Sequence, residues 1–467
     1  MKIIYISLLI TVAITVILVI NGKSTNKQDN RIIYVAQNGN DHYSGTKSHP
    51  LRTLKKASKE ATPGTTIYIR KGIYQEKLIV KHSGTKSKPI LFKAYKQDEV
   101  ILTGKRLKTT KSDPSLIVID NKNHVTIDGL TMQDLTAASA DETAMGVTVT
   151  GSSSHITLKN NHVKRIETLA EGGNAHGIAV YATGPMKDIN ILNNTVEDLK
   201  LGSSEALVLN GNINGFRIEN NLVRRNDNIG IDLIGFEGTF KDEKADFVRH
   251  GVVKGNIVHD ISSYGNPAYG KDYSAGGIYV DGGKNIIIAN NTIYKCDIGI
   301  EATSEHEKKY ADDIHIINNT IYDNTYTGIS IGGYDENRGG TKNTMIARNI
   351  IYRNDTKGLE GGQILLQHDT QNNMIAKNIL TAGPSRLFIA NYFTTNQGNS
   401  LTGNVFHKEK AKTGIWIWKD KAYTSFMAFK RASRSDATSS YVDPRYRDAA
   451  KHDFSLKENS PAKRILE

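Results

Sequence analysis

A five-residue phrase recurs along the chain and carries residues that could do chemistry. Each copy starts with Gly or Ala and alternates apolar residues, and the copies begin at Gly177, Ala206, Gly230, Gly277, Gly299 and Gly328. In a strand, successive side chains point to opposite faces, so the third and fifth positions share the outward face. The third positions then align Asp232, Tyr279 and Glu301, with Asp281 in a fifth position beside them.

We call the aligned residues Asp232, Tyr279 and Glu301 the acidic ridge. The closeness of its carboxyl groups limits the chemistry that this ridge could perform. They repel each other unless a cation or a substrate proton compensates their charge. A Ca²⁺ ion accepts oxygen ligands in irregular geometry. Alternatively, acids about 6.5–9.5 Å apart suit inverting glycoside hydrolysis. Neighbouring strands lie about 4.8 Å apart, which would put the outer two acids about 10 Å apart at the backbone. The third interpretation is that these acids are simply solvated.

Segments next to these phrases add polar side chains that could contact a substrate. We expect His176, Glu237, Lys271 and His306 to serve as substrate-binding residues, because they come from the same repeats as the acids. Acids are denser in this middle region than towards either end of the repeat.

A second repeated phrase indicates how the chain would position this ridge. It reads apolar-x-apolar-x-Asn-Asn or a shortened form, and its last Asn falls at Asn161, Asn194, Asn221, Asn256, Asn291, Asn319, Asn349, Asn378 and Asn404. The spacing is about 26 to 35 residues. Alternating apolar residues predict a strand, and Asn tolerates the left-handed backbone of a sharp corner. One unit cannot bury its apolar face alone, but stacked coils bury a continuous core and bring Asn onto Asn. The sequence therefore predicts an all-β protein, a parallel β-helix.

The ends of the repeat differ from its middle, as the ends of a stacked fold must. Residues 50–62 place Leu51, Leu54, Ala57 and Ala61 at helical spacing, which predicts an N-terminal capping helix. We expect the β-helix domain to span residues 30–411 and an irregular C-terminal cap to span 412–467. That cap carries Trp416 and Trp418, for which a carbohydrate-binding platform is the alternative interpretation.

Composition excludes several classes of protein. The 467 residues carry a net charge of +12 and a single cysteine, Cys296. One cysteine excludes an intramolecular disulfide framework and a cysteine-clustered zinc or iron–sulfur site. The basic residues are dispersed and match no nucleic-acid-binding module, so we expect no nucleic-acid partner. The positive charge would attract polyanions, although it would equally serve solubility or association with a cell wall.

The N-terminal sequence predicts an export segment. Lys2 precedes an almost unbroken apolar run from Ile3 to Ile20. This pattern suits a secretory signal, and the run is also long enough for a membrane-spanning helix. We expect residues 1–24 to be a cleaved signal peptide or an uncleaved membrane anchor, with the rest of the chain extracellular or on the cell surface.

Two terminal motifs carry a resemblance to a known group of proteins. The segment 33–41, followed by Gly45, Thr46 and Pro50, resembles the opening segment of exported β-helix carbohydrate-active proteins, and the segment 453–462 resembles their closing segment. With the repeat, the resemblance extends over nearly the whole chain after residue 30. Among characterised families it is most similar to the family-nine pectate lyases, which implies a right-handed parallel β-helix.

That resemblance implies a calcium ion held by acidic residues and a basic side chain that removes the proton next to a uronate carboxylate. The segment 228–232 keeps the last acid of the calcium motif at Asp232 and has Asn228 in place of the first, while Glu205 occupies the position of the acid from the preceding coil. The implied Ca²⁺ ligands are therefore Glu205, Asn228 and Asp232. The catalytic lysine of the family falls near Tyr279, so the tyrosine would handle the proton here, with Lys271 or Lys284 from a loop as the alternative.

These observations predict an exported polysaccharide-degrading enzyme. The main expectation is a metal-assisted, β-eliminating lyase of an acidic, uronate-containing polysaccharide, with Tyr279, Asp232, Asp281 and Glu301 as catalytic residues. The alternatives are an inverting glycoside hydrolase or a uronate C5-epimerase on the same face, and a non-catalytic glycan-binding protein of the cell surface. We expect a monomer.

Overall fold

The computed structural model describes residues 31–107, 114–409, 413–434 and 437–466. The expected signal or anchor at residues 1–24 lies outside this part of the chain. Among the described residues, no helix combines the length and the hydrophobicity needed to span a membrane.

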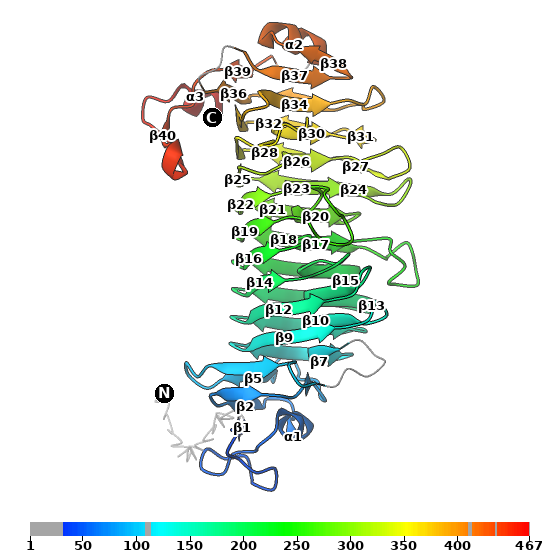
Figure 1. The fold of residues 1–467 in the computed structure, drawn as a ribbon, viewed down its shortest axis with the longest axis vertical. Coiled ribbons are helices and arrows are strands. Elements are labelled where there is room, and N and C mark those ends of the chain that lie inside the picture. The colour runs from blue at the N-terminus through cyan, green and yellow to red at the C-terminus, as the bar shows by residue number, and fades with distance from the viewer. Residues whose placement is uncertain (1–30, 108–113, 410–412, 435–436, 467) are drawn as a thin grey trace, which may run out of the picture.

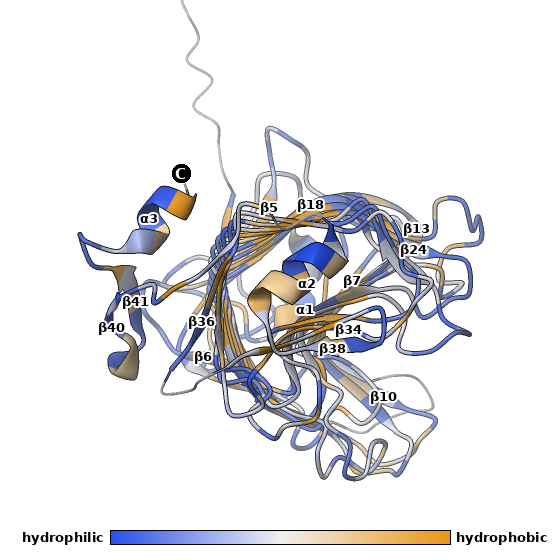
Figure 2. Ribbon diagram, turned by 90° about the horizontal axis from the view of Figure 1, so that it is seen from above, coloured by the Kyte–Doolittle hydropathy of each residue, from blue (hydrophilic) through white to orange (hydrophobic). Residues whose placement is uncertain are grey.

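The short apolar strands stack into a parallel β-helix, which confirms the predicted fold (Figure 1). Each inner coil contributes a strand to each of three faces, and each of these strands pairs in parallel with its counterparts in the coils before and after it. Figure 2, which looks along the stack, shows the strands enclosing a common interior.

The first face, which we call the site face, carries the acidic ridge. Its strands are β4 (Leu78–Ile79), β7 (Ser115–Asp120), β10 (Thr143–Thr150), β13 (Asn174–Leu192), β15 (Leu207–Glu219), β17 (Ile231–Ile234), β20 (Gly276–Asp281), β23 (Ile298–Thr303), β26 (Thr327–Ile331), β30 (Ile364–Leu366), β34 (Leu387–Asn391) and β37 (Ile415–Trp418).

The second face continues round the corner, and the long strands β13 and β15 belong to both faces. Its other strands are β1 (Ile32–Val35), β2 (Thr66–Ile69), β5 (Ile90–Ala94), β8 (Asn123–Asp128), β11 (Ser154–Lys159), β18 (Val248–Lys254), β21 (Lys284–Ala289), β24 (Tyr310–Ile317), β27 (Gly340–Lys342), β28 (Met345–Ala347), β31 (Thr370–Gln371), β32 (Met374–Ala376) and β35 (Ser400–Thr402).

The third face closes the coil as a separate sheet. Its strands are β3 (Gly72–Tyr74), β6 (Val100–Thr103), β9 (Thr131–Ala137), β12 (His162–Thr168), β14 (Thr195–Leu199), β16 (Leu222–Asn226), β19 (Ile257–Ile261), β22 (Thr292–Cys296), β25 (Thr320–Tyr322), β29 (Ile350–Tyr352), β33 (Ile379–Ala382), β36 (Val405–Lys408) and β39 (Ser440–Tyr441).

The corner asparagines form the expected ladder inside the stack. The Oδ1 atom of Asn291 accepts hydrogen bonds from the backbone N–H and the Nδ2 of Asn256, at 2.9 and 3.0 Å. Asn291 Nδ2 in turn donates to Asn319 Oδ1 at 2.9 Å. The same pattern links the other ladder residues from Asn161 to Asn404. Because these side chains are buried and paired, each coil fixes the register of the next one.

The two ends of the stack are closed by short elements. Helix α1 (Leu54–Glu60) begins after Thr53, whose hydroxyl caps it, and buries Leu54 and Ala57. This confirms the predicted capping helix over a shorter range. Helix α2 (Phe426–Ser433) packs at the other end, where it contacts β37.

The site face extends past the expected domain boundary at residue 411, because β37 pairs in parallel with β34. Trp416 and Trp418 lie in β37, and their side chains are buried against aromatic residues that include Phe388 and Phe429. Since the rings are enclosed, they do not form an exposed platform for sugars.

The C-terminal tail folds back on the outside of the third face (Figure 2). It contains β40 (Tyr446–Asp448), the short 3₁₀ helix η1 (Ala449–Lys451), β41 (Asp453–Leu456) and α3 (Pro461–Leu466). Strand β38 (Lys421–Tyr423) is not part of this tail, because it pairs antiparallel with β37 at the end of the site face. Phe454 packs against Tyr322 and Tyr352 of that face, which anchors the tail to the stack.

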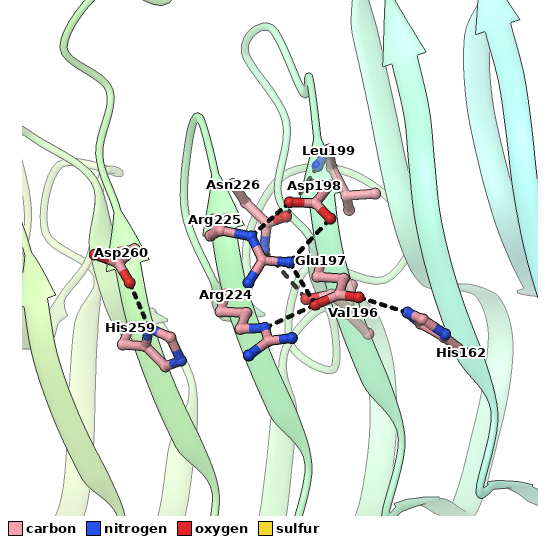
Figure 3. A network of polar contacts seen from close by, with 10 residues as sticks. All are labelled: His162, Val196, Glu197, Asp198, Leu199, Arg224, Arg225, Asn226, His259 and Asp260. Atoms are coloured by element: carbon pink, nitrogen blue, oxygen red, sulfur yellow. Dashed lines mark hydrogen bonds and ion pairs between the residues drawn. The ribbon is translucent and has the colours of Figure 1, made fainter.

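An ion-pair network also joins adjacent coils on the third face (Figure 3). Glu197 of β14 accepts hydrogen bonds from Arg224 and Arg225 of β16 and forms one with His162 of β12, each at 2.7 Å. Burial by itself would raise the pKa of Glu197, but the hydrogen bonds from Arg224 and His162 outweigh it and lower the pKa to about 2.

Candidate active site

The predicted ridge exists on the site face. Asp232 pairs with Tyr279, and Tyr279 pairs with Glu301 on three successive strands, β17, β20 and β23. Inward positions such as Ile278 and Ile300 belong to the hydrophobic core, whereas the ridge residues do not. The alternation of the strands therefore places the three side chains on one outer face, as the sequence predicted.

The ridge is covered rather than open to solvent. The exposed fractions of Asp232, Tyr279 and Glu301 are 2%, 5% and 8%. Residues from the turn 201–206 and from the insertions 235–247, 262–275 and 304–309 reach over the strands. The repeat alone could not indicate this cover, because these segments have no periodic pattern.

The cover forms a cavity of about 280 Å³, which we call the acid pocket. Its lining residues are Tyr181, Ser203, Ser204, Glu205, Asn210, Ile229, Asp232, Ile234, Glu237, Tyr269, Tyr279, Asp281 and Glu305. Five of them are carboxylates and none is lysine or arginine. The pocket thus brings carboxyl groups together without a basic lysine or arginine side chain in its lining.

A chain of hydrogen bonds links the phenol to two acids across neighbouring coils. The Tyr279 hydroxyl donates to Glu305 Oε1 at 3.1 Å. The backbone N–H of Glu305 donates to Asp281 Oδ1 at 2.7 Å. Glu305 lies two residues after strand β23. The sequence feature that could have identified it is its position next to His306, a predicted substrate-binding residue. The sequence prediction did not assign Glu305 a role.

Burial and mutual repulsion favour the protonated forms of Glu205, Asp232 and Asp281. Burial raises the pKa of Asp232 well above its ordinary value, and the charges of Glu205 and Asp281 add to this effect. Burial likewise raises the pKa of Asp281, with Glu305 as the main neighbouring charge. The pKa of Glu205 rises to about 8, again chiefly through burial. A bound cation would reverse these shifts by stabilising the carboxylate forms.

The same environment keeps the tyrosine protonated. Burial raises the pKa of Tyr279 well above its usual range, and the nearby carboxylates Asp281 and Glu305 raise it further. With no cation beside it, Tyr279 is therefore a hydrogen-bond donor. Action as a base requires a change in its surroundings, such as a cation that offsets the carboxylate charges.

Glu301 sits beside the pocket in an environment of its own. It does not line the acid pocket, and its Oε1 accepts a hydrogen bond from Gln367 Nε2 at 3.3 Å. Gln367 also donates to Ser330 Oγ at 2.9 Å, which fixes the amide between the two residues. Burial raises the pKa of Glu301 to about 8. The sequence prediction did not include Gln367, because it lies outside the repeated phrase.

Two of the predicted substrate-binding residues meet at the mouth of the pocket. His306 Nε2 lies 3.0 Å from Glu237 Oε1. Ligand atoms of Glu237, His306 and Asp281 all lie within 4.8 Å of one another, a spacing that could hold a metal ion. The structure therefore brings Glu237 and His306 next to the catalytic candidates, although they come from different coils.

The other two predicted substrate-binding residues behave differently. His176 is buried, with Nδ1 3.0 Å from the backbone oxygen of Glu205 and Nε2 3.0 Å from the Tyr181 hydroxyl. It thus supports two residues that line the pocket. Lys271 is exposed on the 262–275 insertion and is not among the residues that line the acid pocket.

Of the three residues that the resemblance assigns to calcium binding, two line the acid pocket and one does not. Glu205 and Asp232 both line the acid pocket, whereas Asn228 is not among its lining residues and its Nδ2 donates to the hydroxyl of the lining residue Tyr269 at 3.3 Å. Asn210 lines the pocket, and its buried Oδ1 has no hydrogen-bond partner among the described residues. Carboxylate and amide oxygens are the donors that Ca²⁺ prefers, so the residues present fit such an ion.

Comparisons with known proteins agree with this fold. A family described as "Pel9A-like, right handed beta helix region" matches residues 33–196, and a "Right handed beta helix region" matches residues 273–427. The protein YwoF of Bacillus subtilis (strain 168) is 56% identical over 445 residues, which is 95% of each chain.

Two further relatives match less closely. The pectate lyase PEL9 of Emericella nidulans is 39% identical over 83 residues, which cover 17% of this chain and 20% of that protein. The A-module of the mannuronan C-5 epimerase AlgE6 of Azotobacter vinelandii has a TM-score of 0.50 at 14% identity, covering 78% of this chain and 91% of that one. The structural likeness shows the shared right-handed β-helix fold.

Proposed function

Because the chain belongs to the family of right-handed β-helix proteins that includes YwoF of Bacillus subtilis, we propose that it is a polysaccharide-degrading enzyme, a metal-assisted lyase of a uronate-containing glycan. One observation carries the proposal. Five carboxylates line a single cavity of about 280 Å³, and no lysine or arginine lines it. The resemblance to Pel9A-like β-helices and the local match to a pectate lyase support the same assignment.

The pocket acids are the reason to expect that the proposed reaction needs a metal ion. Burying several carboxylates side by side is unfavourable unless a cation joins them. Asp281, whose ligand atom lies within 4.8 Å of those of Glu237 and His306, would hold it together with the pocket acids Asp232 and Glu205. The amide oxygen of Asn210 would be a neutral donor. A bound Ca²⁺ would supply neutralisation of the uronate carboxylate, which acidifies the adjacent C–H bond.

Tyr279 and Glu305 would handle the proton. In β-elimination, the proton at C5 of the uronate is removed, the bond from C4 to the glycosidic oxygen breaks, and a C4–C5 double bond forms. Tyr279 would first pass its phenolic proton to Glu305 Oε1, its hydrogen-bond acceptor at 3.1 Å. The phenolate then takes the proton from C5, and the tyrosine delivers that proton to the leaving oxygen. Glu305 finally returns the first proton to Tyr279, which restores the starting state.

A second candidate, an inverting glycoside hydrolase, is favoured by one observation. Burial raises the pKa of Glu301 to about 8, so this side chain is a carboxylic acid at neutral pH and could protonate a leaving oxygen. A carboxylate of the acid pocket would then activate the water.

Product analysis separates these reactions. The purified chain is incubated with a panel of acidic and neutral polysaccharides, with Ca²⁺ or with a chelator, and the products are examined by ultraviolet absorbance and mass spectrometry. We expect unsaturated products that lack one water and depend on Ca²⁺. Products that gain water would favour the hydrolase. Intact chains of altered stereochemistry would indicate an epimerase. No change in any polysaccharide would refute an enzymatic role on these substrates.

A further inference from the structure

A second cavity lies on the other side of the 235–247 insertion from the acid pocket. It has a volume of about 480 Å³ and is lined by Lys244, Lys284, Lys308, Lys309 and Lys342. We call it the lysine pocket. The insertion separates the two cavities directly, because Phe236 lines the lysine pocket and the next residue, Glu237, lines the acid pocket.

The lysines outnumber the acids available to them. Glu243 is the carboxylate in the lining, and it forms an ion pair with Lys309. Lys342 lies 3.6 Å from Asp312, and Lys308 pairs with its exposed neighbour Glu307 at 2.8 Å. Lys284 forms no ion pair with any residue that the structure describes. The pocket therefore keeps an excess of positive charge around Lys284.

Aromatic rings hold the ammonium groups in place. Lys284 Nζ lies 4.5 Å from the ring centre of Phe247 and 5.4 Å from that of Phe236. Lys309 Nζ lies 5.1 Å from the Phe236 ring, and Lys342 Nζ lies 4.6 Å from the Tyr310 ring. Contacts of this kind orient a cation without neutralising it. The ammonium groups of Lys284, Lys309 and Lys342 are thus oriented around one cavity, whereas Lys244 and Lys308 are exposed at its edge.

Burial also makes it unfavourable to hold several charged lysines close together in the absence of a ligand. Burial lowers the pKa of Lys284, and the neighbouring lysines Lys342 and Lys309 push it in the same direction, against the influence of Asp312. The acid pocket contains acids but no lysine, and the lysine pocket contains lysines but few acids. These groups could neutralise each other, but the 235–247 insertion lies between them. Such separation leaves each cavity complementary to a ligand of opposite charge.

We propose that the lysine pocket is an anion subsite that binds a carboxylate or phosphate group of an acidic glycan, on the far side of the 235–247 insertion from the acid pocket. The assignment of the anion to a glycan rests on the proposed function, whereas the anion site itself does not. A sugar residue that extends past the insertion would place its acidic group among Lys284, Lys309 and Lys342, which selects polyanionic over neutral polysaccharides.

Binding to the full chain tests this proposal without requiring catalysis. Isothermal titration calorimetry at low salt, with a chelator present, would measure two probes: linear tetragalacturonate and inorganic phosphate. The double variant Lys284→Gln, Lys342→Gln should lower the affinity for at least one probe about tenfold, which is equivalent to about 1.4 kcal/mol of binding free energy. The matched control Lys254→Gln, Lys295→Gln removes the same charge from exposed positions on β18 and β22 and should change affinity less than about twofold.

The outcomes distinguish the sources of the anion. If the Lys→Gln double variant loses affinity only for tetragalacturonate, the ligand is a glycan that carries carboxylates. If it loses affinity only for phosphate, the ligand is a glycan that carries phosphate. Lys284→Arg, Lys342→Arg should restore most of the binding, which a folding defect would not allow. Absence of measurable binding of both probes to the unaltered chain, or equal loss in the control, overturns the subsite. If lysine-dependent binding is found but no polysaccharide is cleaved, the proposed function fails and the anion site stands.

Discussion

The phenol of Tyr279, in β20, donates a hydrogen bond of 3.1 Å to Glu305, which follows β23 on the next coil. This contact joins a residue of the regular strand to one of an irregular insertion. It places a protonated hydroxyl beside an acceptor, inside a cavity that also contains Asp232 and Asp281.

Replacing this phenol tests the proton-handling step. Tyr279→Phe should lower kcat about 10²–10⁴-fold, the range expected for a general acid–base residue. Stability should change by only about 1 kcal/mol, because the ring stays packed and one hydrogen bond is lost. Steady-state kinetics and thermal unfolding measure the two effects. The exposed Tyr264, changed to Phe, is the control. Full activity in Tyr279→Phe would remove the tyrosine from the mechanism.

Metal binding should depend on the acids of the ridge. Ca²⁺ at about 100 times its Kd should stabilise the unaltered chain by about 2.7 kcal/mol, since it binds only the folded state. The double variant Asp232→Asn, Asp281→Asn should lose this shift in a thermal melt. Glu336→Gln, an exposed acid outside the pocket, should keep it. A calcium shift that survives in the double variant would place the ion elsewhere.

The acid pocket should make the metal-free chain less stable as the pH rises. The pKa of Glu205 is about 8 in the folded chain, against an ordinary value of 4.5. The unfolded chain therefore loses this proton first, and stability falls between these two pH values. With a chelator present, Glu205→Gln should be more stable than the unaltered chain by about 1–3 kcal/mol at pH 8.5, with little difference at pH 4. The exposed Glu171, changed to Gln, should show no such trend.

The ion-pair network of the third face should have the opposite pH dependence. The pKa of Glu197 is lowered from 4.5 to about 2, so its contribution is complete above pH 4.5 and disappears as the pH falls through 2. Its partners Arg224 and Arg225 are 32% and 41% exposed, which weakens the pairs by solvent screening. Glu197→Gln should cost about 1–2 kcal/mol at pH 7 and much less near pH 2, measured by chemical denaturation. A constant cost across this range would contradict the electrostatic explanation.

The asparagine ladder should be a major source of stability in the stack. Asn291→Ala leaves buried hydrogen-bonding groups of Asn256 and Asn319 without their partner and should destabilise the chain by about 1–3 kcal/mol. Asn337→Ala, at an exposed loop position, should cost less than about 0.5 kcal/mol. Hydrogen exchange around β18, β21 and β24 would show whether the effect spreads to neighbouring coils. Equal stability of the two variants would mean that the ladder contributes nothing.

Much of the architecture follows from local sequence alone. The alternation of Ile and Val with polar residues determined the strands, and the repeated Asn determined the corners and the register between coils. Register in turn aligned Asp232, Tyr279 and Glu301, because a period of two residues fixes which side chains share a face.

The shape of the site was decided by tertiary structure. The insertions 235–247, 262–275 and 304–309 have no repeat, so their paths depend on contacts between residues far apart in sequence, such as Glu237 with His306. These contacts cover the ridge, raise the pKa values of its acids and separate the acid pocket from the lysine pocket. Burial and long-range electrostatics depend on all neighbours in space, and a repeat pattern specifies only the neighbours along and between coils.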